Sequence, residues 1–171
     1  MYDMIVKDAM VLIHLAKMNL LEKACVLFKK VIIPEMVYNE VVIKGKEKEY
    51  EDSFLVESII KENKINIMKV KNKDMLKKLN EFNIYGGEAE SIALYWQENA
   101  KLIASDDNSV IRKRRLLNIN LIGTPSIILY LYKRKFIDKE KINNSIHKLR
   151  EIGWFSNAIL DKTLMEADKY G

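Results

Sequence analysis

The sequence predicts an α/β fold, a central parallel sheet of four to five strands with helices on both faces. Short apolar segments alternate with longer helical patterns along the chain, as parallel strands joined by helical connections require. Gly and Pro are scarce, with 6 and 2 among 171 residues, so long loops are few. The hydrophobic fraction of 49% suffices for a core and no linker is visible, so we expect one domain over residues 1–171.

The first half of the chain predicts three strands and five helical segments. Asn19 is suited to cap the chain between the first two helices, and Pro34 ends a strand and opens the third helix. A charged segment around Gly45 predicts a loop. The strands are expected at residues 4–7, 31–33 and 65–70, the helices at 9–17, 20–28, 35–43, about 50–62 and 74–82, and the loop at 44–49.

The second half predicts two more strands and five helices. A glycine pair opens a helix at Gly86, and a basic helix follows the next strand. Thr124 is suited to cap a helix that has Pro125 at its first position. The strands are expected at residues 101–104 and 119–122, and the helices at 86–99, 107–117, 125–133, 139–151 and 156–169, with those from about 139 packed on the same domain.

Composition excludes several classes of protein. The single cysteine, Cys25, excludes an internal disulfide and fits a reducing compartment. No secretory signal is visible, and the longest weakly polar run is about 12 residues, where a membrane span needs roughly 20. We therefore expect a cytoplasmic protein without a membrane segment. The net charge of +5 favours polyanions only mildly, but basic clusters at residues 112–115 and 133–135 suit contact with a phosphate backbone.

Acidic residues follow two of the predicted strands directly. Asp8 follows the first strand, and Asp106 and Asp107 follow the strand at residues 101–104. In parallel sheets the ligand lies beyond the carboxyl ends of the strands, so we expect these acids at one edge. Carboxylate oxygens are the ligands that Mg²⁺ and Mn²⁺ prefer. The simpler interpretation, that each acid only caps the helix after it, stays open.

Helices carry three further acids whose roles the pattern leaves open. Glu40 lies at the edge of an apolar stripe, where a carboxylate either reaches inward or is solvated. Glu88 and Glu90 flank the stripe of their helix on opposite sides, and periodicity does not choose between them. Ser105, Asn108 and Thr124 are polar residues near strand ends that either cap helices or bind water or phosphate. His14 and His147 are isolated, without metal-ligand spacing, and are expected to be ordinary helix residues.

Four segments at these acids, in this order, resemble the PIN domain family, in the branch of small prokaryotic proteins related to the toxins of toxin–antitoxin pairs. They are KDAMVLIHLAK around Asp8, VIIPEMVYNEV around Glu40, GGEAESIAL around Glu88 and LIASDD at Asp106. The resemblance continues through LIGTPSIILYLYKRKFI and IHKLREIGWFSNAIL. It covers roughly residues 3–165.

The resemblance implies a Rossmann-like PIN fold and a nuclease that cleaves single-stranded or structured RNA with Mg²⁺ or Mn²⁺. By position it gives the acidic quartet of metal-binding and catalytic residues as Asp8, Glu40, Glu88 and Asp106. It disfavours Glu90, which would pair with Asn108, and leaves Asp107 as an additional metal ligand. The partners it implies besides RNA are a protein antitoxin and a second copy in a homodimer.

The basic helix supplies candidates for substrate contact. Arg112 and Arg114 follow the strand-end acids closely and are expected to contact RNA phosphates. Two positions depart from the family: Met10 stands where Ser or Thr is usual, and Ala104 where a polar residue is often found. These departures keep an alternative open, a PIN-fold binding module with weak or no catalysis. A haloacid-dehalogenase-like phosphatase is disfavoured, because it needs a second Asp at the position of Met10.

Overall fold

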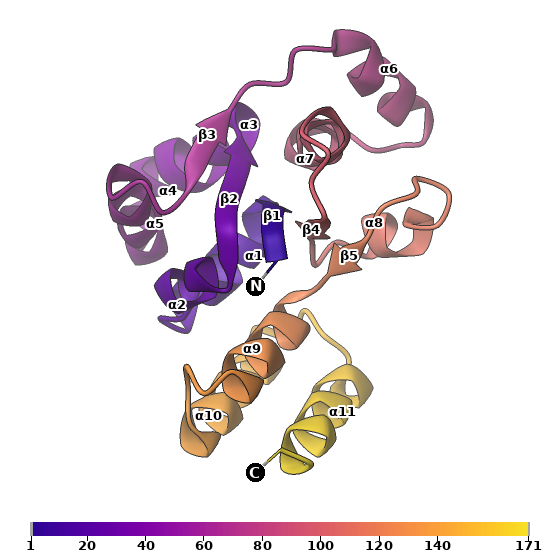
Figure 1. Ribbon diagram of the computed structural model, residues 1–171. Coiled ribbons are helices and arrows are strands. Elements are labelled where there is room, and N and C mark those ends of the chain that lie inside the picture. The colour runs from indigo at the N-terminus through magenta and orange to yellow at the C-terminus, as the bar shows by residue number, and fades with distance from the viewer. Residues whose placement is uncertain (1, 171) are drawn as a thin grey trace.

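The computed structural model describes the backbone of residues 2–170 and the side chains of residues 4–170. Its centre is a parallel sheet of five strands in the order β3-β2-β1-β4-β5 (Figure 1). The predicted α/β fold with a parallel sheet is confirmed. In chain order the strands are β1 (Tyr2–Lys7), β2 (Phe28–Pro34), β3 (Asn66–Met68), β4 (Leu102–Ala104) and β5 (Leu121–Ile122).

Strand residues alternate between the two faces of the sheet, as the twofold period of extended chain requires. Ile5 packs into the core on one face and Val6 into the core on the other. β1 and β4 end at the same level, because Lys7 pairs with Ala104 and the backbone N–H of Asp8 donates to the Ala104 carbonyl oxygen at 3.0 Å. The residues after both strands therefore lie at one edge, which we call the carboxyl edge.

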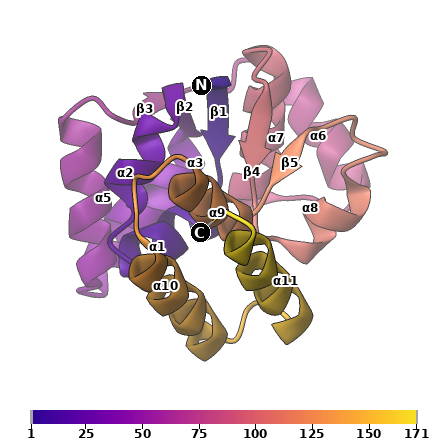
Figure 2. The same cartoon turned by 60° about the horizontal axis from the view of Figure 1, so that its bottom comes forward.

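Helices cover both faces of the sheet, as predicted. The face with Ile5 packs against α1 (Ala9–Lys17), α2 (Leu21–Val26), α5 (Glu51–Lys61), α9 (Thr124–Lys133), α10 (Lys139–Ile152) and α11 (Asn157–Asp168). The face with Val6 packs against α6 (Lys73–Glu81), α7 (Gly86–Gln97) and α8 (Asn108–Lys113). Figure 2 shows α10 and α11 side by side beyond α9, and both contact α9.

The predicted loop at residues 44–49 is wrong over most of its length. The chain forms α3 (Glu35–Tyr38), a π-helical turn η1 (Asn39–Ile43) and α4 (Lys44–Glu47) in direct succession. Gly45 is buried against Ser53, and a Cβ built on it would lie 2.8 Å from the Ser53 Cβ. Close packing of α4 on α5 therefore keeps this charged segment helical, which its composition does not indicate.

Several element ends also differ from prediction, because tertiary contacts decide them. The second helix ends at Val26, since Phe28 pairs with Tyr2 and so begins β2. Asn19 has φ 53 and takes the left-handed conformation that ends α1. The basic helix α8 ends at Lys113 rather than at residue 117.

Among the helices of residues 2–170, none is both long enough and apolar enough to cross a bilayer.

Candidate active site at the carboxyl edge

Asp8 lies at the carboxyl edge, directly after β1, and it does cap the following helix. Its Oδ1 accepts a hydrogen bond from the Val11 N–H at 3.0 Å, and the residue is only 4% exposed. Its carboxylate also hydrogen-bonds the side chain of Ser105. The Ser105 hydroxyl oxygen in turn accepts from the Asp107 N–H at 3.2 Å. Ser105 thus joins the ends of β1 and β4 at this edge.

Asp106 is buried, and both its carboxylate oxygens accept hydrogen bonds from the protein. Oδ1 accepts from the Thr124 N–H at 2.7 Å, while Oδ2 accepts from the Thr124 hydroxyl at 2.5 Å. Oδ2 also lies 2.8 Å from Nδ1 of His14. Its backbone oxygen accepts from Nε1 of Trp154 at 2.8 Å. The prediction that Thr124 caps α9 is wrong, because Gly123 is the N-cap and the Thr124 side chain binds Asp106 instead.

His14 and Trp154 were not expected at this edge. His14 is 1% exposed, lies on the buried side of α1 and packs near the rings of Trp154 and Phe155, with centroids at 6.4 and 5.5 Å. The interpretation of His14 as an ordinary helix residue therefore misses its contact with Asp106. The one local signal was its place within the otherwise apolar run Val11–Ala16.

Asp107 caps α8 and faces α7. Its Oδ1 accepts from the N–H groups of Ser109 and Val110 at 2.6 and 3.0 Å. Its side chain also shares a hydrogen bond with the carboxyl group of Glu88, in the first turn of α7. Asp107 and Glu88 are therefore brought together, where the end of β4 meets the beginning of α7.

Glu40 approaches the same place from the π-helical turn η1. A Cβ built on Gly87 would lie 2.8 Å from its Oε2 and 3.2 Å from Cγ2 of Val37, so the α7 backbone leaves room for the carboxylate only because glycine stands there. Glu40 also acts electrostatically on Glu88. The positive N-terminal end of α7 favours a carboxylate at this position. Glu90, by contrast, accepts from the Met36 N–H at 3.1 Å and lies outside this group.

Burial and mutual repulsion shape the electrostatics of these acids. The pKa of Asp8 is raised to about 7, mainly by burial and to a smaller extent by the charges of Asp106 and Glu88, while its hydrogen bonds with Ser105 and Val11 oppose the rise. The pKa of Glu88 is likewise raised to about 7. Burial is the largest cause, and the interactions with Asp107 and Glu40 contribute less. Carboxyl groups in this arrangement are stabilised by a cation.

The donor chemistry fits a hard divalent cation, since carboxylate oxygens are what Mg²⁺ and Mn²⁺ prefer. The acids form a series of neighbouring pairs: among the side chains of residues 4–170, no three His, Cys, Asp or Glu groups lie together at ligand spacing. In the same range, no Lys or Arg side chain forms an ion pair with Asp8, Glu40, Glu88 or Asp107. A cation would therefore meet no competing protein charge in direct contact.

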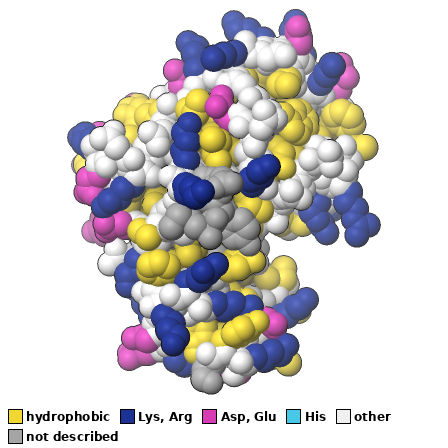
Figure 3. Space-filling model, viewed as in Figure 1, with side chains coloured by type: hydrophobic (Ala, Val, Ile, Leu, Met, Phe, Trp, Pro, Cys, Tyr) yellow, Lys and Arg dark blue, Asp and Glu magenta, His cyan; other side chains and the backbone are white. Residues whose placement is uncertain are grey.

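Of the predicted phosphate contacts, Arg112 lies on α8 and Arg114 directly follows its last residue, and both are exposed. Figure 3 shows Lys and Arg side chains gathered over this helix at the right of the molecule. Arg114 donates to the backbone oxygen of Ile111 at 2.5 Å, which turns its side chain along α8. Lys113, between them, is the basic residue whose charge acts on Glu88. The structure thus places a basic surface beside the acids without joining the two.

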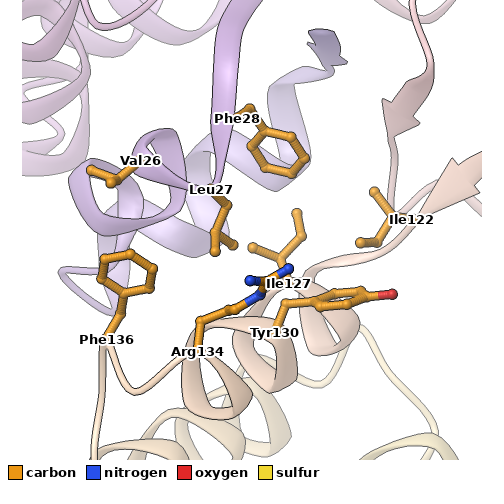
Figure 4. Close-up of a pocket in the computed structure, with 8 residues that line it drawn as sticks. All are labelled: Val26, Leu27, Phe28, Ile122, Ile127, Tyr130, Arg134 and Phe136. Carbon is orange, nitrogen blue, oxygen red and sulfur yellow. The ribbon is translucent and has the colours of Figure 1, made fainter. Parts of the chain in front are cut away.

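A separate pocket lies under the sheet, between the α2–β2 junction and α9. Its volume is about 130 Å³, and Figure 4 shows the Arg134 guanidinium beside Ile127 and Tyr130, with Phe28 above them in this view. None of its eight described lining residues is acidic, so it is not a metal site. Near it, Nζ of Lys7 is fully buried and lies 5.5 Å from the Phe28 ring centroid, without a hydrogen-bond partner among the described residues.

A five-stranded parallel sheet with acids gathered at its carboxyl edge defines a Rossmann-like α/β protein with an acidic site. The chain belongs to the PIN domain family, whose profile matches residues 4–169. PIN domains are generally nucleases and typically use divalent metal ions. Comparison with curated proteins gave no match, and neither did comparison with solved structures.

Proposed function

We propose that this PIN domain is an Mg²⁺- or Mn²⁺-dependent ribonuclease, an endonuclease that cleaves RNA phosphodiester bonds. The observation that carries the proposal is the gathering of Asp8, Glu40, Glu88 and Asp107 at the carboxyl edge without a Lys or Arg ion pair in the described chain. Like charges that the fold brings together at a cost to stability are typical of sites that bind a cation. The basic surface of α8 next to them suits an RNA backbone.

Within this site we assign metal binding, in part through water molecules, to Asp8, Glu88 and Asp107, and a supporting place to Glu40 at the N-terminus of α7. Asp106, which the resemblance gives as a direct ligand, is assigned a positioning role. Its carboxylate oxygens already accept hydrogen bonds from His14 and Thr124, and its backbone is fixed by Trp154. Through these bonds Asp106 fixes the turn that carries Asp107.

The bound ion would supply Lewis acidity, which lowers the pKa of a water molecule and offsets charge on the phosphate. The chain's own groups position the reactants. Asp8 is fixed by its capping bond to Val11 and its bond to Ser105. Arg112 and Arg114 bind the flanking phosphates and draw the RNA toward the carboxyl edge.

Substitution of the acids tests this assignment. Cleavage of a fluorophore-labelled single-stranded RNA with Mn²⁺ should fall at least about 100-fold in Asp8→Asn and Asp107→Asn, whose Mn²⁺ binding by calorimetry should also weaken. Asp106→Asn should instead lower the free energy of unfolding by about 1–3 kcal/mol, because its amide group cannot accept from the same donors. Glu81→Gln, an exposed acid on α6, is the matched control.

Two results would contradict the proposal. Cleavage that survives both Asp8→Asn and Asp107→Asn would exclude the mechanism. An intact protein that binds no Mn²⁺ would favour the alternative, a catalytically weak or inactive binding module, which the departure at Met10 supports.

We also propose that α10 and α11 belong to one domain with the sheet, since Trp154 between them bonds Asp106 and both helices contact α9. Single-phase unfolding of residues 1–171 would support this. The protein antitoxin and the homodimer stay predictions of the family resemblance. Sedimentation of the purified chain tests the homodimer, and co-purification with the product of the adjacent gene tests the antitoxin.

A further inference from the structure

A groove of about 760 Å³ lies between the edge of the sheet and the last helix. α8, β5 and α9 form one side, and the α10–α11 connection with α11 forms the other, at the indentation on the right of Figure 3. Asp106 and Gly123, which follow β4 and β5, are among its lining residues. The groove therefore opens at the carboxyl edge, where the proposed metal site lies.

Trp154 is an aromatic wall of this groove. The hydrogen bond from its Nε1 to the Asp106 oxygen, at 2.8 Å, fixes one edge of the indole. The residue nevertheless remains 42% exposed, although tryptophan is highly buried on average. Folding already holds this indole by one edge and leaves part of its surface open beside an acidic site. A base can therefore stack on it without the entropic cost of first ordering the side chain.

The other lining residues supply the chemistry that a nucleotide needs. Arg114, directly after α8, and Lys162, on α11, are exposed cations from opposite sides of the groove. Ile159 is 50% exposed and adds apolar surface. Asn108, Ser126 and Ser156 provide donors and acceptors for the edge of a base. Glu166 is the one acid here besides Asp106.

We infer that the groove binds one nucleotide of a single-stranded RNA beside the cleaved bond. Its base stacks on Trp154, and its phosphate lies between Arg114 and Lys162. This inference rests on the proposed ribonuclease function, and it names where the substrate enters. A duplex does not fit it, because paired bases are not free to stack on a side chain.

An apolar peptide is the competing occupant, and the charges disfavour it. It would cover Ile159 and the indole but would leave Arg114 without an anion, whereas Lys162 already has the charge of Glu166 nearby. A nucleotide pairs with both cations and uses the aromatic surface as well. The basic surface of α8 continues in the same direction, so neighbouring phosphates have further contacts.

Tryptophan fluorescence tests the inference without metal and without cleavage. The chain has two tryptophans, Trp154 and the half-buried Trp96 of α7. In EDTA, an eight-nucleotide oligouridylate should quench the emission of the wild type and of Trp96→Phe, but not of Trp154→Phe. Trp154→Leu should bind the oligonucleotide about 5- to 150-fold more weakly, and Trp154→Phe less weakly than that, because Phe keeps a stacking ring.

A second variant separates binding from folding. Ile159→Glu leaves the Trp154–Asp106 bond in place and adds a negative charge to the groove, so it should weaken oligonucleotide binding. Ala158→Glu, on an exposed neighbouring position of α11 outside the groove, should not. Quenching that persists in Trp154→Phe, or equal affinity of Ile159→Glu and wild type, would overturn the inference. Binding that follows this pattern without any RNA cleavage would contradict only the proposed catalysis.

Discussion

Replacing Asp8 by Asn should stabilise the metal-free protein above neutral pH. The Asp8 carboxyl group is buried at the carboxyl edge beside Asp106 and Glu88, and its pKa is raised from 3.8 to about 7. The folded state therefore disfavours the ionised group that the unfolded chain carries freely. Asn keeps an oxygen that can accept from Val11, so the cap of α1 is retained.

The size and pH range of the effect follow from the two pKa values. Below pH 4 the group is protonated in both states and there is no penalty. Between pH 4 and 7 only the unfolded state ionises, so the penalty grows by 1.36 kcal/mol for each pH unit. Above pH 7 the penalty is complete. Its upper bound, calculated from the pKa values of 3.8 in the unfolded state and about 7 in the folded state, is about 4 kcal/mol.

Urea unfolding in EDTA at pH 5, 6.5 and 8 measures this difference. Asp8→Asn should exceed the wild type in free energy of unfolding by about 2–4 kcal/mol at pH 8, and by progressively less toward pH 5. Asp138→Asn is the matched control: Asp138 caps α10 through the Lys141 N–H but is exposed. Its substitution should change the free energy by less than about 0.5 kcal/mol at every pH.

Adding Mn²⁺ should narrow the difference in free energy of unfolding between the two proteins. An ion at 100 times its dissociation constant stabilises the folded wild type by about 2.7 kcal/mol, and Asp8→Asn should gain less. A variant no more stable than the wild type at pH 8 in EDTA, with a normal control, would refute the reasoning. So would an equal gain from Mn²⁺ in both proteins.

Three further changes test other parts of the structure. Gly87→Ala should displace the Glu40 carboxylate and slow RNA cleavage about 10- to 100-fold by assay, without loss of stability in thermal unfolding. Lys7→Met should raise the free energy of unfolding by about 1–3 kcal/mol in urea, because burial disfavours the charged Lys7 and lowers its pKa. The gain should disappear as the pH rises toward 10.5, where Lys7 is no longer charged in the unfolded state either. Neutralising Arg112 and Arg114 should reduce the slope of log affinity for RNA against log salt by about 1.4.

Each of these changes has a refuting outcome or a control variant. Gly87→Ala with wild-type cleavage would remove Glu40 from the mechanism. Lys101→Met, at an exposed lysine, should leave stability within about 0.5 kcal/mol of the wild type. Neutralising Lys61 and Lys148, exposed on other helices, should leave the salt slope unchanged; an equal drop there would argue against a specific role for α8.

The fold could be predicted because its signals are local. Strands buried on both faces are short apolar runs, and helices show a period of 3.6, so α1 was predicted with its observed ends, Ala9–Lys17. Errors occurred where a distant partner decides the conformation. Phe28 is extended because it pairs with Tyr2, and residues 44–47 are helical because Gly45 packs on Ser53.

The candidate site could be predicted only in outline. The sequence places acids after β1 and β4, but it does not show which of Asp106 and Asp107 has its carboxylate fixed by His14 and Thr124. These two residues lie 92 and 18 residues away from Asp106 along the chain. Likewise a π-helical turn alters the direction of Glu40, and a period of 3.6 cannot anticipate it.

The hydrogen bond between Trp154 and Asp106 can form only late in synthesis of the chain. The two residues are 48 positions apart, and a ribosome adds about 5–20 residues each second, so Asp106 is made about 2–10 s before its partner. During this interval the turn that carries Asp107 lacks a bond on which its position depends. Under the proposed assignment of Asp107, the site would therefore not be fully formed until Trp154 has been synthesised.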